Sequence, residues 1–221
     1  PEKYWNEEYF HIEENYFKYE ITVAKKLLKN KGPHLALDIG GGIGKAHVVL
    51  NKNGFDTISI EPSFSFKEIA ISKFKLDESK FLHSSIEDAS FEENYFDFIT
   101  FGAVLEHLYE PSESLEKAIK WLKPGGLIQI EVPSSKYLIS KLFNLYFKIM
   151  GTNYVTNLSP MHVPYHLYEF DLKSFELNAK KLGYEIAHFE YFVCNIYKIP
   201  TILHPLLKWI MKKTNTGMQL S

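Results

Sequence analysis

A glycine-rich turn between an apolar run and a helical run constrains the fold of this chain most. It lies in LALDIGGGIGKAHVVL, residues 35–50, where Asp38 ends a short stretch suited to a buried strand. The glycines of this turn are Gly40, Gly41, Gly42 and Gly44. Glycine permits positive φ angles and a close approach of the backbone to a ligand. We therefore expect a strand–turn–helix unit that holds a nucleotide or a nucleoside.

Strand-like and helix-like patterns alternate over residues 35–132. The predicted strands are 35–39, 57–60, 80–83, 96–101 and 127–132, and the predicted helices are 16–29, 44–53, 64–73 and 111–122. Such alternation is typical of a doubly wound, mostly parallel α/β sheet with helices on both faces. Ligands bind these sheets at the carboxyl ends of the strands. Asp38, Glu61, residues 84–88 and residues 101–107 fall at such ends.

The pattern changes after residue 132. Residues 136–150 predict an amphipathic helix, and a polar, aromatic loop follows them. We interpret 136–168 as an inserted helical lid, because long loops in compact domains commonly cover binding sites. The remaining expectations are a helix between Asp171 and Gly183, two last strands at 185–192 and 193–199, an N-terminal helical cap at 1–30 and a single domain over 1–221.

Two common nucleotide loops do not fit the glycine-rich turn. A P-loop needs a first glycine where Ile39 stands and a Ser or Thr where Ala46 stands. The dinucleotide pattern G-x-G-x-x-G meets Lys45 or His47 at its last position, depending on the first glycine chosen. A D-x-G-x-G-x-G spacing does fit, starting at Asp38.

This spacing resembles the first motif of the class I S-adenosylmethionine-dependent methyltransferases. The later segments FDFITF, LEHL and LKPGG are similar to the central block of that family, and the likeness covers roughly residues 35–134. The resemblance implies a Rossmann-like seven-stranded sheet with an antiparallel last strand. It also implies S-adenosylmethionine as the cofactor and methyl transfer as the reaction.

The resemblance implies cofactor roles for particular residues. Asp38 and the glycines would bind the cofactor, and the N-terminus of the helix after the turn would suit its methionine carboxylate. Glu61, followed by Pro62, would accept the ribose hydroxyls. Ser85 stands where relatives have an adenine-binding Asp, Ile86 would offer its backbone N–H, and Glu87 or Asp88 are alternatives to Ser85. Phe101 and Gly102 would complete the cofactor site at the end of the fourth strand.

The candidate catalytic residues are histidines, because a hydroxyl acceptor needs a general base. His166 is the preferred base and His107 the second candidate, although His107 is equally consistent with a helix-start residue bonded to nearby backbone. We expect His162, Tyr165 and Tyr168 to contact the acceptor. We expect no metal, because Pro164 opposes the helix that would bring His162 and His166 onto one ion.

Composition bears on the acceptor and the partners. The formal net charge of −2 gives no support for a nucleic-acid substrate. The lid and its resemblance favour O-methylation of a small molecule such as a sugar or a surface-polysaccharide (capsule) precursor. A quinone or lipid acceptor and a non-catalytic cofactor-binding module are the alternatives. We expect a cytoplasmic protein without an integral membrane segment. The apolar stripes at 137–150 and 200–213 are consistent with core, homodimer or membrane-surface contacts.

Overall fold

The structure is a computed structural model of the 221-residue chain. It describes residues 11–28, 32–156, 165–193, 196 and 199–221. The chain divides into two compact units, of which the first contains residues 1–102 and 113–129 and the second contains residues 103–112 and 130–221. The glycine-rich turn belongs to the first unit, and the segment around His107 belongs to the second.

Parallel strands form the centre of the first unit. These are β1 (His34–Ile39), β2 (Phe55–Glu61), β3 (Phe81–His83) and β4 (Phe96–Gly102). β1 lies between β2 and β4, and β2 pairs with β3. Burial on both faces explains the nearly continuous apolar runs of β1 and β4. The predicted strands of this region are confirmed, with small shifts at their ends.

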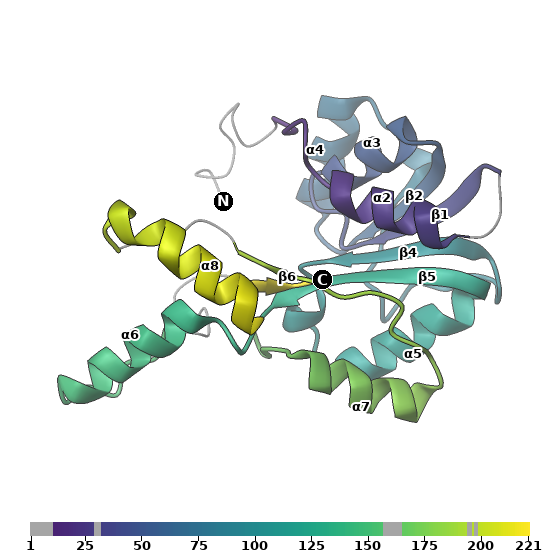
Figure 1. The fold of residues 1–221 in the computed structure, drawn as a ribbon. Coiled ribbons are helices and arrows are strands. Elements are labelled where there is room, and N and C mark those ends of the chain that lie inside the picture. Colours follow the sequence, from purple (N-terminus) through teal and green to yellow (C-terminus); the bar gives the residue numbers. More distant parts are fainter. Residues whose placement is uncertain (1–10, 29–31, 157–164, 194–195, 197–198) are drawn as a thin grey trace. The chain divides into compact units, whose positions relative to one another are not determined.

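Four helices accompany these strands: α2 (Lys18–Leu27), α3 (Lys45–Lys52), α4 (Phe64–Phe74) and α5 (Pro111–Trp121). Ile21 of α2 and Leu50 of α3 pack with Phe55 and Phe98 of the strands in one buried cluster. α2 and α3 lie on one side of β4, and α5 lies on the other (Figure 1). The sheet is therefore covered on both faces, as predicted.

Strand β5 (Leu122–Pro133) is longer than expected. The sequence predicts a helix-ending turn at KPGG before a strand at 127–132, whereas the structure begins the strand directly after α5. A Cβ on Gly126 would lie 3.0 Å from the carbonyl oxygen of Asp97. Gly126 thus serves close approach to the neighbouring strand rather than helix termination.

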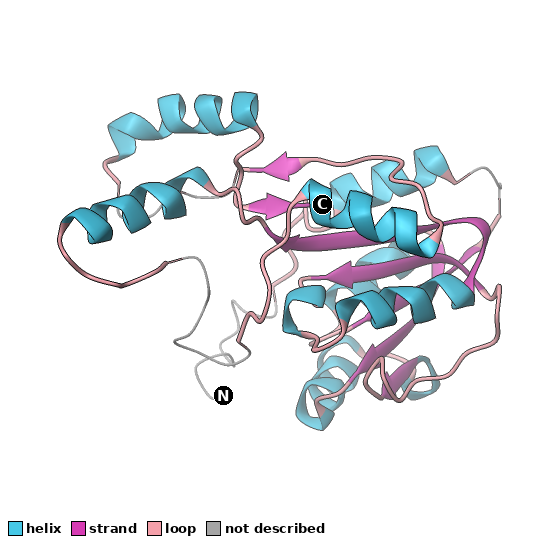
Figure 2. Cartoon of the chain, turned by 90° about the horizontal axis from the view of Figure 1, so that it is seen from below, coloured by secondary structure: helices cyan, strands magenta, loops and turns pink. Residues whose placement is uncertain are grey.

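The sheet has seven strands in the order β3-β2-β1-β4-β5-β7-β6. β7 (Gln219–Leu220) pairs antiparallel with β5 and with β6 (Tyr191–Phe192), and the strands and helices can be followed in Figure 2. The predicted Rossmann-like α/β sheet is confirmed. Of the described residues in the two last strands predicted at 185–192 and 193–199, Tyr191 and Phe192 alone form a strand, so the first prediction is wrong in extent, and residues 194, 195, 197 and 198 of the second lie outside the described part of the chain. Their partner β7 is also two residues long.

The second unit contains α6 (Leu138–Ile149), α7 (Leu172–Leu182) and α8 (His204–Thr214), with the 3-10 turns η3 (Leu105–His107) and η4 (Thr201–Leu203). Asp171 is the N-cap of α7, and its carboxylate accepts the N–H of Ser174 at 3.0 Å; Gly183 is the C-cap, as predicted. The helix predicted at 136–150 is confirmed as α6. Helices of the described residues are all too short or too polar to cross a bilayer.

Candidate functional site

The glycine-rich turn is fixed to the end of β2 by its backbone. The N–H groups of Gly40 and Gly41 both donate to the carbonyl oxygen of Ile60, at 2.9 and 3.0 Å. The N–H of Gly44 donates to the carbonyl of Gly41 at 2.8 Å. Gly40, Gly42 and Gly44 have φ of +70°, +52° and +84°. These left-handed conformations explain why glycine occupies alternate positions of the motif.

Gly44 also allows α3 to pack against its neighbours. A Cβ at Gly44 would lie 2.9 Å from Cδ1 of Leu76 and 3.1 Å from Cβ of Ala70. Gly44 is the N-cap of α3 and brings no side chain to that helix end. The first-turn N–H groups of a helix suit an anionic group such as the methionine carboxylate.

Glu61 connects this turn to the start of α4. The N–H of Gly42 donates to Oε2 of Glu61 at 2.8 Å, and the N–H of Ser63 donates to Oε1 at 2.8 Å. Glu61 is 5% exposed, and burial raises the pKa of its carboxyl against the lowering effect of these two hydrogen bonds. Each carboxylate oxygen can accept a second hydrogen bond. The geometry therefore fits the predicted contact with ribose hydroxyls.

A buried polar network lies beneath the turn. Ser59 Oγ donates to Oδ2 of Asp38 at 3.3 Å and lies 2.9 Å from Nδ1 of His47. Burial raises the pKa of Asp38 to about 7. The hydrogen bond from Ser59 opposes this increase, and the charge of Glu61 adds to it. Burial lowers the pKa of His47 to about 4, so His47 is neutral at pH 7. Sequence analysis missed His47 and Ser59.

The predicted adenine segment starts beside Glu61. The N–H of Ser84 donates to the carbonyl oxygen of Glu61 at 3.2 Å. Nε2 of His83 lies 2.9 Å from the carbonyl oxygen of Pro62, and a carbonyl only accepts, so this nitrogen carries a proton. The ends of β2 and β3 thus bring Pro62 and the segment after β3 together.

Ser85 and Asp88 form one side-chain pair in this segment. Ser85 Oγ donates to Oδ2 of Asp88 at 2.9 Å and accepts the N–H of Asp88 at 3.2 Å. Ile86 is buried, whereas Glu87 and Asp88 are exposed. Of the two acidic residues, Asp88 is the one held in place by the serine at the predicted adenine position.

Phe101 and Gly102 end β4 in different environments. The side chain of Phe101 is fully buried, with 0% exposure, whereas Gly102 is exposed. Any cofactor contact of Phe101 therefore comes from its backbone.

The second unit brings three candidate side chains together. Glu106, His107 and His166 each place one oxygen or nitrogen atom within 4.8 Å of the others. Nδ1 of His107 donates to the carbonyl oxygen of Tyr165 at 3.0 Å, which directs Nε2 to within 4.0 Å of Oε1 of Glu106. The rings of His107 and His166 lie edge to face with centroids 5.0 Å apart. Both predicted catalytic histidines thus share one cluster.

Glu106 is the residue of this cluster that sequence analysis missed. It is 1% exposed, and its Oε2 has no hydrogen-bond partner among the described residues. Burial, with a further contribution from the charge of Glu131, raises the pKa of Glu106 to about 7. The available signal was the LEHL segment, where this carboxylate precedes His107.

Residues 165–168, which the sequence predicts as part of a lid, contact the segment around this cluster through backbone and side-chain atoms. The N–H of Leu167 donates to the carbonyl oxygen of Glu106 at 2.7 Å. Tyr168 Oη donates to the carbonyl of Tyr109 at 2.9 Å. The side chains of Tyr165 and Tyr168 are exposed by 50% and 41%. His162 lies outside the described residues, so its predicted role stays a prediction.

The chain matches the family model described as "Methyltransferase domain" over residues 12–188. It is 31% identical over 112 residues to a tRNA 5-carboxymethoxyuridine methyltransferase of Escherichia coli, covering 48% of this chain and 43% of that protein. It is 28% identical over 148 residues to a ubiquinone biosynthesis O-methyltransferase of Coxiella burnetii, covering 66% of this chain and 57% of that protein. The chain spans about half the length of these curated relatives.

Among solved structures, an S-adenosylmethionine-dependent methyltransferase from Archaeoglobus fulgidus has a similar fold. The TM-score is 0.60 at 17% identity, with 92% of this chain and 90% of that chain covered. The family match covers well over half of the chain, and S-adenosylmethionine is the cofactor of this family. The chain therefore belongs to the class I S-adenosylmethionine-dependent methyltransferases.

Proposed function

We propose that this protein transfers the methyl group of S-adenosylmethionine to a hydroxyl oxygen of a small acceptor, with Glu106 taking the proton of that hydroxyl. In the reaction the bond between the methyl carbon and the sulfonium sulfur breaks as a carbon–oxygen bond forms. The sulfur keeps the bonding electron pair, and the hydroxyl proton passes to the carboxylate. The observation that carries this proposal is the buried Oε2 of Glu106, which has no hydrogen-bond partner within the described part of the chain.

Glu106 meets the requirements of a general base. A base works best when its pKa is close to the working pH, and burial raises the pKa of Glu106 to about 7. His107 keeps its position through the Tyr165 carbonyl, and His166 lies against His107. We therefore assign proton removal to Glu106 instead of the predicted bases His166 and His107, which become positioning residues for Glu106.

We propose an amphiphilic acceptor of the quinol or lipid type. The relative named for ubiquinone biosynthesis carries out O-methylation according to its name. The second unit of this chain exposes large apolar side chains on α6, η4 and α8, including Ile149 of α6 and Ile202 of η4. Both facts favour a partly apolar acceptor.

A sugar or polysaccharide precursor is the second candidate. The exposed rings of Tyr165 and Tyr168 favour it, because aromatic faces combine an apolar surface with a polar tip. A nucleic-acid acceptor is less favoured by the net charge of −2, although one relative is named for a tRNA substrate.

A methyl-transfer assay with labelled cofactor tests the proposal on three acceptor pools: prenylated quinols, nucleotide sugars and total tRNA. We expect transfer to the quinol pool. Glu106→Gln should lower kcat about 10²- to 10⁴-fold, the usual contribution of a general base. Its affinity for S-adenosylhomocysteine should stay within twofold of the wild type.

Glu110→Gln is the matched control, because Glu110 is exposed and lies four residues after Glu106. It should retain full activity. Unchanged activity of Glu106→Gln would remove Glu106 as the base. Cofactor binding with no transfer to any of the three pools would favour the non-catalytic module.

A further inference from the structure

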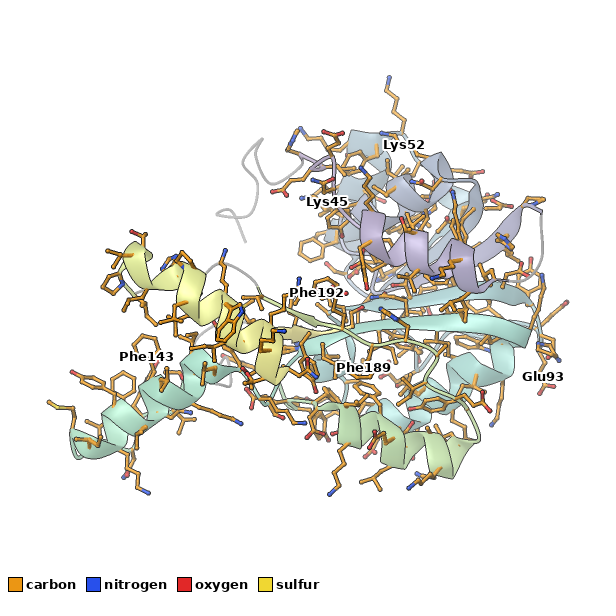
Figure 3. All side chains as sticks on the ribbon, in the orientation of Figure 1. Lys45, Lys52, Glu93, Phe143, Phe189 and Phe192 are labelled. Carbon is orange, nitrogen blue, oxygen red and sulfur yellow. The ribbon has the colours of Figure 1, made fainter. Side chains whose placement is uncertain are left out.

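Two helices of the second unit form a separate hydrophobic cluster. Ile139 of α6 and Met211 of α8 are buried together with Ile196. Phe143 of α6, which is labelled in Figure 3, and Leu207 of α8 pack against this cluster. The two helices thus pack against each other, each through one face.

The rest of α6 exposes a second apolar stripe. Leu142, Leu145, Tyr146 and Ile149 recur at three- and four-residue spacing, which places them on one side of the helix. They are exposed by 45%, 56%, 54% and 75%. Apolar side chains of this size at consecutive helical turns are unusual on a surface that contacts only water.

The segment η4–α8 repeats this arrangement. Ile202, Leu203, Leu206 and Trp209 are exposed by 84%, 45%, 55% and 61%. Ile202, Leu206 and Trp209 follow helical spacing. Tryptophan and tyrosine favour the boundary between water and hydrocarbon, and each helix exposes one of the two.

The charges on both helices have a single sign. Residues 136–156 and residues 199–216 contain six lysines and no Asp or Glu. Lys136 lies 3.8 Å from a carboxylate oxygen of Asp171. The other five lysines are Lys141, Lys148, Lys208, Lys212 and Lys213, and all are exposed. The chain as a whole has a net charge of −2, so its acidic residues lie elsewhere.

We propose that α6 and η4–α8 form a docking surface for anionic lipid bilayers, with their apolar side chains inserted among the headgroups. Amphipathic helices with lysines beside apolar residues bind membranes by combined burial and attraction to acidic lipids. A 12-residue helix such as α6 is about 18 Å long, which suits a position in the plane of the interface.

A second copy of the chain fits this surface less well than a membrane does. A two-fold contact would place the same lysine-bearing helices of both copies against each other, and like charges would meet. Lysine is also depleted in the cores of protein interfaces. Anionic lipid headgroups, in contrast, complement all five lysines at once.

Vesicle co-sedimentation of the whole chain, without cofactor or acceptor, tests the proposal independently of any enzymatic activity. We expect binding to vesicles of phosphatidylglycerol and phosphatidylcholine and at least tenfold weaker binding to phosphatidylcholine alone. Lys141→Glu combined with Lys208→Glu should weaken binding at least tenfold, and so should Leu145→Ser combined with Trp209→Ser. These side chains are exposed, so the substitutions should leave the circular-dichroism melting curve unchanged.

Two α7 variants are the matched controls. Lys173→Glu combined with Lys180→Glu reverses exposed charges, and Leu177→Ser removes an apolar side chain that is 57% exposed. Both should bind like the wild type. Equal losses in the α7 variants, or no preference for anionic vesicles, would overturn the proposal. Sedimentation velocity showing a dimer that Leu145→Ser with Trp209→Ser dissociates, without vesicle binding, would assign the surface to a second copy instead.

Discussion

The backbone N–H of Gly42 donates to Oε2 of Glu61 at 2.8 Å, so a hydrogen bond joins the glycine-rich turn directly to the carboxylate that we propose binds ribose. Ser63 donates to the other oxygen of the same carboxylate. Backbone N–H groups thereby fix the position of the Glu61 carboxylate, at the end of β2, relative to the turn that follows β1. Such prior positioning reduces the ordering that binding requires.

Glu61→Ala should weaken binding of S-adenosylmethionine by roughly 1.5–3 kcal/mol, the range for a hydrogen bond to a charged group. Titration calorimetry measures this loss directly. Glu68→Ala is the control, because Glu68 is an exposed acidic residue of α4. An affinity equal to the wild type would reject the role of Glu61.

Gly44→Ala should lower the free energy of unfolding by about 1–3 kcal/mol more than Gly54→Ala, because overpacking adds to backbone strain. Gly44 and Gly54 have similar φ angles of +84° and +88°. Only at Gly44 would the new Cβ meet neighbours within 4 Å. Urea denaturation of both variants measures the difference, and equal losses would show that packing against Leu76 and Ala70 is not limiting.

Asp38→Asn should change how stability depends on pH. The pKa of Asp38 is about 7 in the folded protein and 3.8 ordinarily, so folding retains a proton that the unfolded chain releases. Its contribution is fully present below about pH 4 and is lost as pH rises through 7. The melting temperature of Asp38→Asn relative to wild type should therefore rise between pH 5 and pH 8.

The rate of methyl transfer should rise with pH and level off above about 7, because Glu106 accepts a proton only when it is ionised. Glu106→Gln should remove this inflection along with most of the rate. Initial rates from pH 5.5 to 9 at saturating cofactor measure it. An inflection that persists in Glu106→Gln would assign the titration to another group.

Chelation should leave the activity unchanged, since we predict no metal at this site. The prediction needs testing because the ligand atoms of Glu106, His107 and His166 lie within 4.8 Å of one another. Dialysis against EDTA followed by a rate measurement is sufficient. If activity is lost on chelation and restored by Mg²⁺ or Zn²⁺, the expectation is wrong and the cluster is a metal-binding site.

The strands of the first unit could be predicted because buried strands consist of short runs of apolar residues, which are visible in the sequence itself. The apolar run of β1 ends at Asp38–Gly40, and that of β4 ends at Gly102. Both runs can be recognised without knowledge of the tertiary structure. The last strands could not be predicted in the same way. β6 exists only where Gln219 and Leu220 return to pair with it, and that pairing depends on residues far along the chain.

The sequence allowed us to predict which residues belong to the candidate site, but not the burial and hydrogen bonding of their side chains. Asp38, the glycines and Glu61 follow from motif spacing. The network of His47 and Ser59 follows only from the register that sets Ser59 beside Asp38. The backbone hydrogen bond from Leu167 to Glu106 likewise joins residues far apart in the sequence, and no local pattern reveals it.

Two enclosed carboxyls that protonate near neutrality also affect how the purified protein behaves in solution. The formal charge of −2 counts Asp38 and Glu106 as ionised and the histidines as neutral, so protonation of both carboxyls brings this formal charge to zero. Electrostatic repulsion between molecules is then weakest, and precipitation is favoured. Storage near pH 8 should therefore keep the protein dispersed, whereas dialysis through pH 6.5 should be the step at which material is lost.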